Sequence, residues 1–487
     1  MRIKIGKYYI LSWVIGYFLI TQSVAYGQYL NQVIETTNTY EYSYNWNYEA
    51  NNLVGIYTYQ DSNWLQSGWS GLEFKSYDEN LNLLNSAKYY DVDYNYWSGW
   101  SVAFDGENYY YVGGKEDILT SDTITAYLIK FNPQGDVLWE KNFYTNSRRS
   151  WAVYCVYRDD SLYISGNIRD PITDDIETFM FSADTSGQMG WDRIIANNSP
   201  SNVSLDTTQD GGFLLSVFRQ YGINDPTTIY KLDSLGNTEW ERQLTFPNGE
   251  HVLSATEMPD GNVLCYGHSD HPIYTTKRSW LVKLDNMGNV LQDTVFDFSE
   301  GYDIFGNPNN VLFYGGEFQI IGGKYDNLSS NTAKLHLLRF DFDLNILWRR
   351  EYNARLNENV MGLQKKLNNG FTFLAGSVSQ DANNETGDQW FMVVDSLGCV
   401  SPNCVLGIEE NETSVFTIYP NPSKGEITIS LNSTIEPTTI ELLDMNGRVL
   451  TSIPYSQKVS FNQETGIYLL RLKSGEGEIG TTRIALY

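Results

Sequence analysis

Three of the four histidines of this chain fall in one short stretch. His251 opens one apolar pattern, and His268 and His271 follow the next, with Asp270 between them. Adjacent antiparallel strands would bring these positions together. Imidazole and carboxylate groups are ligands for transition metals, so the stretch predicts a metal site at His251, His268 and His271, although its spacing matches no established ligand signature. No other cofactor is indicated.

A second set of residues has the chemistry of ligand recognition. Aromatic rings offer flat apolar faces for stacking, and side-chain amides donate and accept hydrogen bonds, as sugar or peptide recognition requires. When the repeats described below are aligned, such residues recur where the innermost strands begin. They are Trp46, Trp100, Trp151, Asn202, His251, Asn310 and Asn359. We expect them around the mouth of a central channel, either as a binding site or as rim residues without a ligand.

The evidence for catalysis is weaker. The chain has no HExxH, no GxSxG and no glycine-rich phosphate loop. No catalytic residue is predicted, and a role without catalysis is favoured. The alternative is an extracellular enzyme that degrades polysaccharide or peptide, because two carboxylates from different repeats would leave no local motif.

These residues belong to a unit that is repeated seven times. Each copy has an apolar strand, a tight turn and a second strand, as in residues 229–244. The first turn residues lie 49 to 56 residues apart, at Asp78, Asn132, Asp184, Asp233, Asp285, Asp341 and Asp395. With two further strands before each turn, the unit has four antiparallel strands, which is typical of a β-propeller blade. The sequence predicts an all-β chain with a seven-bladed β-propeller.

Two features recur inside the unit. A Trp occurs seven residues after the first turn residue, at Trp139, Trp191, Trp240 and Trp348. We expect it to pack between neighbouring sheets, with a carbohydrate platform as the alternative. The turn aspartates are expected to bond the backbone two residues on, with a ring of calcium sites as the alternative. In two copies Leu81 and Leu344 replace the turn glycine.

The seventh copy lacks its fourth strand, because a Cys-containing segment follows Asp395. Residues 29–36 precede the first complete set of strands and are predicted to supply the missing strand, which closes the ring. The connections between second and third strands are long, polar and unlike one another, whereas the turns between third and fourth strands are nearly identical. A scaffold that varies on one face is expected to bind something there.

The N-terminus has the pattern of a signal peptide. A basic segment precedes the apolar run Tyr8 to Ile20, and Ala25-Tyr26-Gly27 predicts cleavage before Gln28. In the chain that would remain after this cleavage, no segment is apolar enough to span a membrane. The net charge of −26 disfavours nucleic acid and anionic lipid as partners.

The four cysteines divide into two kinds. Cys399 and Cys404 lie close in sequence and are expected to form a disulfide in an oxidising compartment. Cys155 and Cys265 lie in apolar strand patterns of different repeats. Because no adjacent base accompanies them, we expect them to be buried and inert.

The C-terminal residues 415–487 no longer fit the repeat, and an acidic linker at 405–414 precedes them. Pro-Asn-Pro at 420–422 opens a strand, and residues 444–447 form a hairpin turn, which predicts a small immunoglobulin-like β-sandwich. Three blocks resemble the type A C-terminal sorting domain of Bacteroidota type IX secretion cargo. Their motif residues are Tyr419, Pro420, Asn421, Pro422, Asp444, Gly447, Gly466, Tyr468 and Arg483.

That resemblance implies recognition by the type IX secretion machinery and a secreted or outer-membrane surface-attached protein. The propeller repeats are also similar to the DGG and KLD-x-x-GN repeats common in such cargo, which names a scaffold and no activity. The expected organisation is a signal peptide at 1–27, a propeller at 28–404, a linker at 405–414 and a sorting domain at 415–487. The expected role is a binding or adhesion module for a glycan or protein ligand, with a structural surface or motility-associated component as a further alternative.

Overall fold

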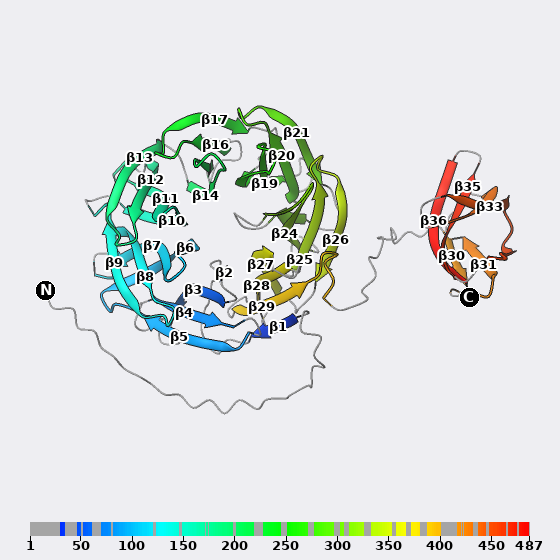
Figure 1. The fold of residues 1–487 in the computed structure, drawn as a ribbon, viewed down its shortest axis with the longest axis horizontal. Coiled ribbons are helices and arrows are strands. Elements are labelled where there is room, and N and C mark those ends of the chain that lie inside the picture. The colour runs from blue at the N-terminus through cyan, green and yellow to red at the C-terminus, as the bar shows by residue number, and fades with distance from the viewer. Residues whose placement is uncertain are drawn as a thin grey trace, which may run out of the picture. The chain divides into compact units, whose positions relative to one another are not determined.

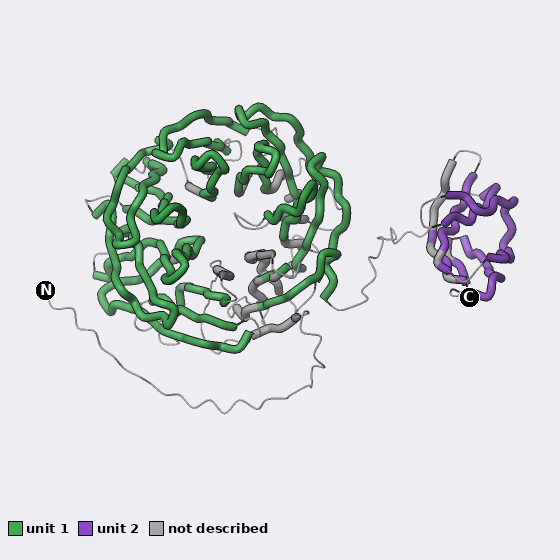
Figure 2. Tube along the Cα trace, in the orientation of Figure 1, with its two compact units in different colours: residues 1–404 green, residues 405–487 purple. Residues whose placement is uncertain are grey.

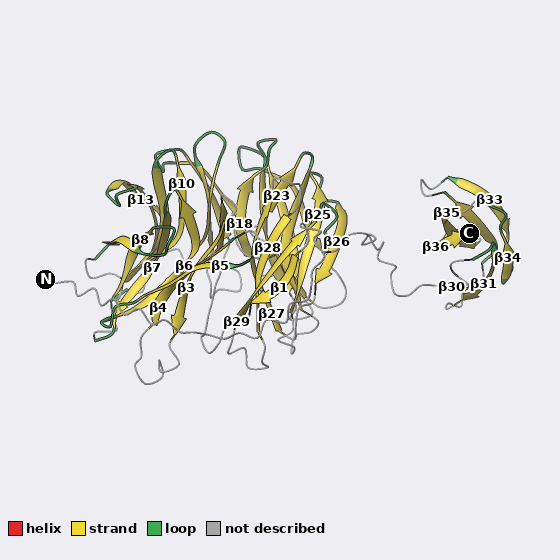
Figure 3. Ribbon diagram, turned by 60° about the horizontal axis from the view of Figure 1, so that its bottom comes forward, coloured by secondary structure: helices red, strands yellow, loops and turns green. Residues whose placement is uncertain are grey.

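The computed structural model divides the chain into two compact units, Met1–Cys404 and Val405–Tyr487 (Figure 2). The residues that the structure describes are 30–34, 46–49, 52–60, 70–78, 81–119, 123–145, 149–170, 172–173, 175–197, 201–218, 227–244, 251–270, 277–296, 302–305, 311–325, 333–352, 357–366, 372–379, 387–400, 416–419, 421, 423–431, 437–444, 448–463, 466–474 and 477–486. Throughout these ranges the chain forms strands and turns (Figure 3). No helix long and apolar enough to cross a membrane occurs in them.

The strands described in the first unit form seven antiparallel sheets. The first contains β2 (Trp46–Glu49), β3 (Asn52–Gln60), β4 (Ser70–Tyr77) and β5 (Leu83–Tyr89). The second contains β6 (Tyr94–Phe104), β7 (Tyr109–Asp117), β8 (Ile124–Phe131) and β9 (Val137–Phe143). The third contains β10 (Arg149–Arg158), β11 (Ser161–Arg169), β12 (Ile176–Asp184) and β13 (Met189–Ala196).

The remaining sheets of this unit follow in chain order. The fourth contains β14 (Ser201–Thr207), β15 (Phe213–Phe218), β16 (Thr227–Leu232) and β17 (Thr238–Leu244). The fifth contains β18 (His251–Glu257), β19 (Val263–Asp270), β20 (Lys277–Leu284) and β21 (Val290–Phe296). The sixth contains β22 (Tyr302–Phe305), β23 (Val311–Tyr314), β24 (Glu317–Tyr325), β25 (Ala333–Asp341) and β26 (Ile346–Tyr352). The seventh contains β27 (Asn357–Lys366), β28 (Thr372–Ser379), β29 (Gly387–Val394) and β1 (Leu30–Ile34).

The sheets stand around a ring, with the first strand of each sheet on the inside and the last on the outside (Figure 1). This radial arrangement of antiparallel sheets is that of a β-propeller. The outermost strands alternate between exposed and partly buried residues, as in β21. The middle strands are buried on both faces, as β4 and β12 illustrate. Apolar runs therefore form the middle strands, and alternating sequences form the outer ones.

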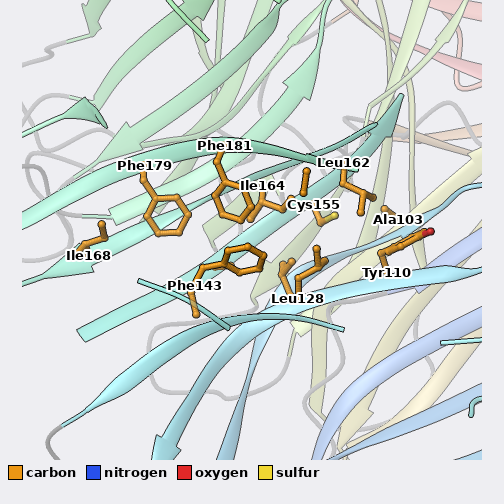
Figure 4. Packing of buried hydrophobic residues seen from close by; sticks show 14 residues of the cluster. Ala103, Tyr110, Leu128, Phe143, Cys155, Leu162, Ile164, Ile168, Phe179 and Phe181 are labelled. Carbon is orange, nitrogen blue, oxygen red and sulfur yellow. The ribbon is translucent and has the colours of Figure 1, made fainter. Parts of the chain in front are cut away.

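Neighbouring sheets are held together by apolar cores. Between the second and third sheets, Phe143 packs against Phe181 with ring centroids 4.7 Å apart, and Leu128 and Ile164 belong to the same fully buried cluster (Figure 4). Each sheet alone would expose this surface, so its stability depends on its two neighbours.

The two ends of the ring meet. Strand β1 pairs with β29 in antiparallel register, from Leu30 opposite Val393 to Ile34 opposite Gln389. The first sheet also touches the seventh, because β2 contacts β27 and the Tyr77 ring lies 6.0 Å from that of Phe391. Strands from both ends of the unit therefore share one sheet, and that sheet packs on the first.

The second unit is built from two further sheets. One contains β30 (Phe416–Tyr419), β31 (Glu426–Leu431) and β34 (Lys458–Ser460). The other contains β32 (Thr439–Leu443), β33 (Val449–Pro454), β35 (Gly466–Ser474) and β36 (Gly477–Leu486). Both sheets contribute to one core, in which Ile429, Leu442 and Leu470 are fully buried.

Candidate functional site

The turn aspartates are used by the backbone, as predicted. Asp233 Oδ1 accepts hydrogen bonds from the amides of Leu235 and Asn237, at 2.9 and 2.8 Å. Its second carboxylate oxygen accepts from the Asn237 side chain at 2.8 Å, and this bond lowers the pKa of Asp233. In the second sheet the two residue types exchange places. The first turn residue is Asn132, and its side chain donates to the carboxylate of Asp136 at 3.1 Å. These oxygens are committed to the turn, which does not favour calcium sites there.

The recurrent tryptophans pack between sheets, which confirms the prediction for them. Each ring lies against the turn glycine of the next sheet. A Cβ added at Gly236 would lie 2.6 Å from the Trp191 ring, and one added at Gly288 would lie 2.8 Å from the Trp240 ring. The Trp240 indole also donates to the carbonyl oxygen of Asn286 at 3.0 Å. Gly187 meets Trp139, and Gly398 meets Trp348, in the same way.

The two turns without glycine fill this space themselves. Leu81 and Leu344 adopt positive φ angles of 60° and 61°, and their exposed fractions are 6% and 3%. The sheet before Leu344 has Gln292 at the Trp position, and its side chain donates to the carbonyl oxygen of Asp343 at 2.8 Å. A left-handed Leu therefore replaces the Trp–Gly contact at this junction.

The predicted metal ligands meet only in part within the described residues. His251 and His268 are cross-strand partners at one end of β18 and β19. Their side chains, and the whole of His271, lie outside the described residues. Among the residues that are described, no group of three or more His, Cys, Asp or Glu side chains could hold a metal ion. The metal site therefore stays a prediction.

The sheet register locates the predicted channel-mouth residues. Trp151 of β10 lies opposite Asn167 of β11, and Asn167 lies opposite Thr178 of β12. Thr178 lies six residues before the turn at Asp184, and this relation defines the place of Trp151 in its sheet. His251 and Asn359 occupy the same place in the fifth and seventh sheets. Asn202 is displaced from it by one residue. Trp46 begins β2, and Asn310 lies outside the described residues.

In the second sheet this place belongs to Trp97 and not to Trp100. Trp97 lies opposite Gly114, which lies opposite Ala126, six residues before the turn at Asn132. A wide bulge at 99–101 shifts the register between Ser98 and Val102. The bulge adds residues that counting along the sequence assigns to regular strand. The alternation of the strand is the signal that could have identified Trp97.

Trp97 and Trp151 thus hold equivalent positions in adjacent sheets. A Cβ added at Gly114 would lie 3.1 Å from Cβ of Trp151, so Trp151 lies against the glycine that pairs with Trp97. The Trp97 side chain is 55% exposed and that of Trp100 is 39% exposed. Trp100 meets Tyr154 edge to face, with centroids 6.1 Å apart. We call Trp97, Trp100, Trp151 and Tyr154 the aromatic sector.

A buried polar network fixes the strand that carries Trp97. Glu140 accepts hydrogen bonds from the hydroxyls of Tyr89 and Tyr96, at 2.6 and 3.1 Å, and from Lys115 Nζ at 2.6 Å. Burial, and then the negative charge of Glu140, raises the pKa values of both tyrosines, which keeps them as neutral donors. Lys115 also lies over the Tyr94 ring at 4.4 Å. These contacts anchor Tyr94 and Tyr96 of β6. Because successive residues of a strand face opposite sides, Trp97 faces away from this network.

The charges beside the aromatic sector are paired. Arg149 lies two residues before Trp151, and Glu116 lies two residues after Gly114. Their side chains form an ion pair at 3.8 Å. The sector can therefore offer aromatic faces and hydrogen bonds without a large local charge of either sign.

The cysteines behave as predicted where the structure describes them. Cys155 and Cys265 are free and buried, and burial raises the pKa of each thiol, so neither is an activated nucleophile. Cys399 is disulfide-bonded. Cys404 lies outside the described residues, so the pairing of these two stays a prediction.

Most of the predicted sorting-domain residues can be placed. Tyr419 ends β30 and is 57% exposed, and Asn421 is exposed. Asp444 accepts a hydrogen bond from the Arg448 amide at 2.9 Å, and β32 and β33 on either side of these two residues are paired. Gly466 and Tyr468 lie in β35, where Leu469 pairs with Arg483 of β36. Pro420, Pro422 and Gly447 lie outside the described residues.

Comparisons with known proteins agree with this division. Residues 417–485 match the family described as "Secretion system C-terminal sorting domain", which implies export through the type IX secretion system to the cell surface or the extracellular space. No curated protein matches the sequence.

Solved structures similar to this chain include β-propellers. The Dos1 propeller has a TM-score of 0.44 at 11% identity, over 74% of this chain and 93% of its own. The β-propeller domain of the Trilobed protease from Pyrococcus furiosus has a TM-score of 0.42 at 11% identity, over 73% of this chain and 94% of its own. The polysaccharide lyase Uly1 has a TM-score of 0.47 at 9% identity, over 77% of this chain and 94% of its own.

Proposed function

We propose that the protein is an exported binding module whose ligand site is the aromatic sector of a seven-bladed β-propeller. In this proposal each of the seven sheets is one blade, and β1 closes the ring as the outer strand of the last blade. The C-terminal unit is an immunoglobulin-like sorting domain read by the type IX secretion machinery of a member of the Bacteroidota, and a signal peptide precedes the first blade. The destination is the cell surface or the surrounding medium.

One observation carries the binding role. Trp97 and Trp151 occupy equivalent positions in adjacent sheets, yet Trp97 is 55% exposed, whereas the recurrent Trp residues lie against a glycine of the next sheet. An exposed indole beside other aromatic rings is typical of a recognition surface. Tyr90 and Val92, which precede β6, are also exposed, at 47% and 67%.

A binding screen tests the proposal. The full chain is applied to a glycan array and to a panel of extracellular proteins and peptides, next to a variant with Trp97→Ala and Trp151→Ala. The matched control carries Leu138→Ala and Met287→Ala, which removes exposed apolar side chains of other regions, 51% and 67% exposed. We expect the wild-type chain and the control to bind the same ligand and the Trp variant to lose it.

Two outcomes contradict the proposal. If the Trp variant binds as well as the control, the site lies elsewhere. If the wild-type chain releases products from a polysaccharide or peptide substrate, the protein is an enzyme and the binding role alone is insufficient.

A further inference from the structure

The hydroxyl of Tyr154 is a buried polar group without a hydrogen-bond partner in the described part of the chain. The residue is 1% exposed and lies on β10, the innermost strand of the third sheet. Buried polar groups almost always have a partner, because losing water without replacing its hydrogen bonds is costly. An exception of this kind calls for a physical explanation.

The second and fourth sheets have a serine at the same place. Ser101, Tyr154 and Ser204 occupy the same place in the register of their sheets. In each sheet the next residue of the innermost strand pairs with the second strand, and that partner pairs with the residue of the third strand that lies three positions before the turn. Both serines are satisfied inside the protein. Ser101 Oγ accepts from the Cys155 amide at 2.6 Å and donates to its carbonyl oxygen at 3.0 Å, and Ser204 Oγ lies 2.6 Å from Ser216 Oγ. The third sheet alone among these replaces a bonded serine with a tyrosine that extends further.

The Tyr154 ring is buried and lies against a second aromatic ring, that of Trp100. Trp100, on the innermost strand of the second sheet, meets the ring at 6.1 Å and an interplanar angle of 87°, and it keeps 39% of its own surface exposed. Burial raises the pKa of Tyr154, and Tyr266 of the fifth sheet raises it further. The hydroxyl therefore remains a neutral donor and acceptor at every physiological pH.

We propose that Trp100 and Tyr154 form a sugar subsite, in which a pyranose ring stacks on the indole of Trp100 and one of its hydroxyls bonds the Tyr154 hydroxyl. The assignment rests on the binding role proposed above and names its ligand as a neutral oligosaccharide. A sugar ring has an apolar face of C–H groups and hydroxyls at its edge, which matches one indole and one adjacent phenol. Because Tyr154 is 1% exposed, the proposal requires the partly exposed indole of Trp100 to shift when the sugar stacks on it, so that the sugar gains access to the hydroxyl.

Charge favours a neutral sugar over an acidic one. The chain carries a net charge of −26, which repels polyanions such as uronate chains. The cations described beside the aromatic sector already have acidic partners, since Arg149 pairs with Glu116 and Lys115 with Glu140. An acidic sugar would have to displace one of these partners.

Four versions of the full chain test the assignment: wild type, Tyr154→Phe, Trp100→Ala and Tyr157→Phe. Tyr157 lies on the same strand, and its hydroxyl donates to Asp160 at 2.9 Å, so its replacement by Phe is a matched control. The probes are neutral gluco-, xylo-, manno- and galacto-oligosaccharides, oligogalacturonates as the acidic arm, and a peptide library. Affinity is measured by titration calorimetry and stability by thermal unfolding.

We expect a neutral oligosaccharide to bind the wild type and Tyr157→Phe equally. Its affinity for Tyr154→Phe should fall about 3- to 10-fold, which is the effect of one neutral hydrogen bond. Its affinity for Trp100→Ala should fall at least about 10-fold. The melting temperature of Tyr154→Phe should stay unchanged or rise, because the substitution removes a hydroxyl that has no internal partner.

Several results would overturn the assignment. A lower melting temperature for Tyr154→Phe would reveal an internal partner for the hydroxyl. Binding of only oligogalacturonates or peptides would exclude the neutral sugar. If a neutral sugar binds and the Trp97→Ala, Trp151→Ala variant loses it while Tyr154→Phe and Trp100→Ala keep full affinity, this subsite fails and the broader binding role stands. If the wild type binds no probe at all, the sugar subsite fails, and the glycan array and protein panel described above decide whether the broader binding role stands.

Discussion

The turns that join third to fourth strands and the aromatic sector lie toward different ends of the same sheets, and they use their side chains differently. In the turns, Asp233 and its equivalents bond the backbone, and a Trp or a Leu fills the space beneath. In the aromatic sector, Trp97 and Trp100 stay exposed and the Tyr154 hydroxyl has no described partner. Residues that recur in several copies hold the ring together, so departures from the repeat are the places to look for binding.

The largest effect is expected where a recurrent Trp is removed. Trp240→Ala takes away a ring that lies against Gly288 and an indole that donates to Asn286 at 3.0 Å. Because the ring is half-buried, the free energy of unfolding should fall by about 2–3 kcal/mol, below the loss for a fully buried Trp. Urea unfolding measures it, and a loss below about 0.5 kcal/mol would contradict the packing role.

The junction at Leu344 tests whether the two ways of filling the turn are equivalent. Leu344→Gly removes a side chain that is 3% exposed but relieves a φ of 61°, so a net loss of about 2 kcal/mol is expected. Gln292→Trp alone should also destabilise, because Leu344 occupies the space that the new ring needs. The free energy of unfolding of the double variant should exceed the value obtained by adding the two single effects by at least about 1 kcal/mol. Strictly additive effects would show that the Trp–Gly contact is not a unit.

A pair of glycines separates packing from backbone strain. Gly211 and Gly236 have φ angles of 84° and 76°, but a Cβ at Gly211 would meet nothing within 4 Å, whereas one at Gly236 would lie 2.6 Å from Trp191. Gly211→Ala should cost about 1 kcal/mol from strain alone. Gly236→Ala should cost about 1–2 kcal/mol more, because the Trp191 ring must move. Equal costs in chemical unfolding would mean that the ring moves freely.

The junction of the fourth and fifth sheets should respond to pH. Burial raises the pKa of Asp206 to about 6, although its carboxylate accepts a 2.6 Å hydrogen bond from Thr256. The folded state then binds a proton more tightly than the unfolded chain, whose carboxyl has a pKa of 3.8. Stability should therefore rise by about 1–2 kcal/mol as pH falls from 8 through 6 toward 4, less than the full shift implies because the residue is partly exposed.

Asp206→Asn is the matched control for this dependence, and it should flatten the curve between pH 8 and 4. Asp210 has the opposite sign. Burial acts to raise its pKa, but the hydrogen bonds from Lys231 and Thr208 lower it to about 2. The stability that this group contributes is lost only as pH falls from about 4 toward 2. A wild-type curve without a rise between pH 8 and 4 would contradict the assignment to Asp206.

The sequence was sufficient for the parts of the molecule that depend on local spacing. The turn aspartates, the recurrent Trp residues and the burial of Cys155 and Cys265 follow from patterns within single repeats, and the structure confirms them. Trp97 was missed because the bulge at 99–101 shifts the count of residues along β6. Tyr154 and Asp206 were missed for another reason. Their environments depend on side chains from other sheets, which no pattern within a single repeat specifies.

The smallest stability effect is expected in the aromatic sector, and it decides what the exposed indole is for. Trp97 is 55% exposed, so Trp97→Ala should change the free energy of unfolding by less than about 0.5 kcal/mol. The same substitution at Trp240 removes a ring wedged against the next sheet and should cost several times more. If Trp97→Ala destabilised the chain as much as Trp240→Ala, its indole would be another inter-sheet contact. If stability holds and ligand binding is lost, the side chain is kept for recognition.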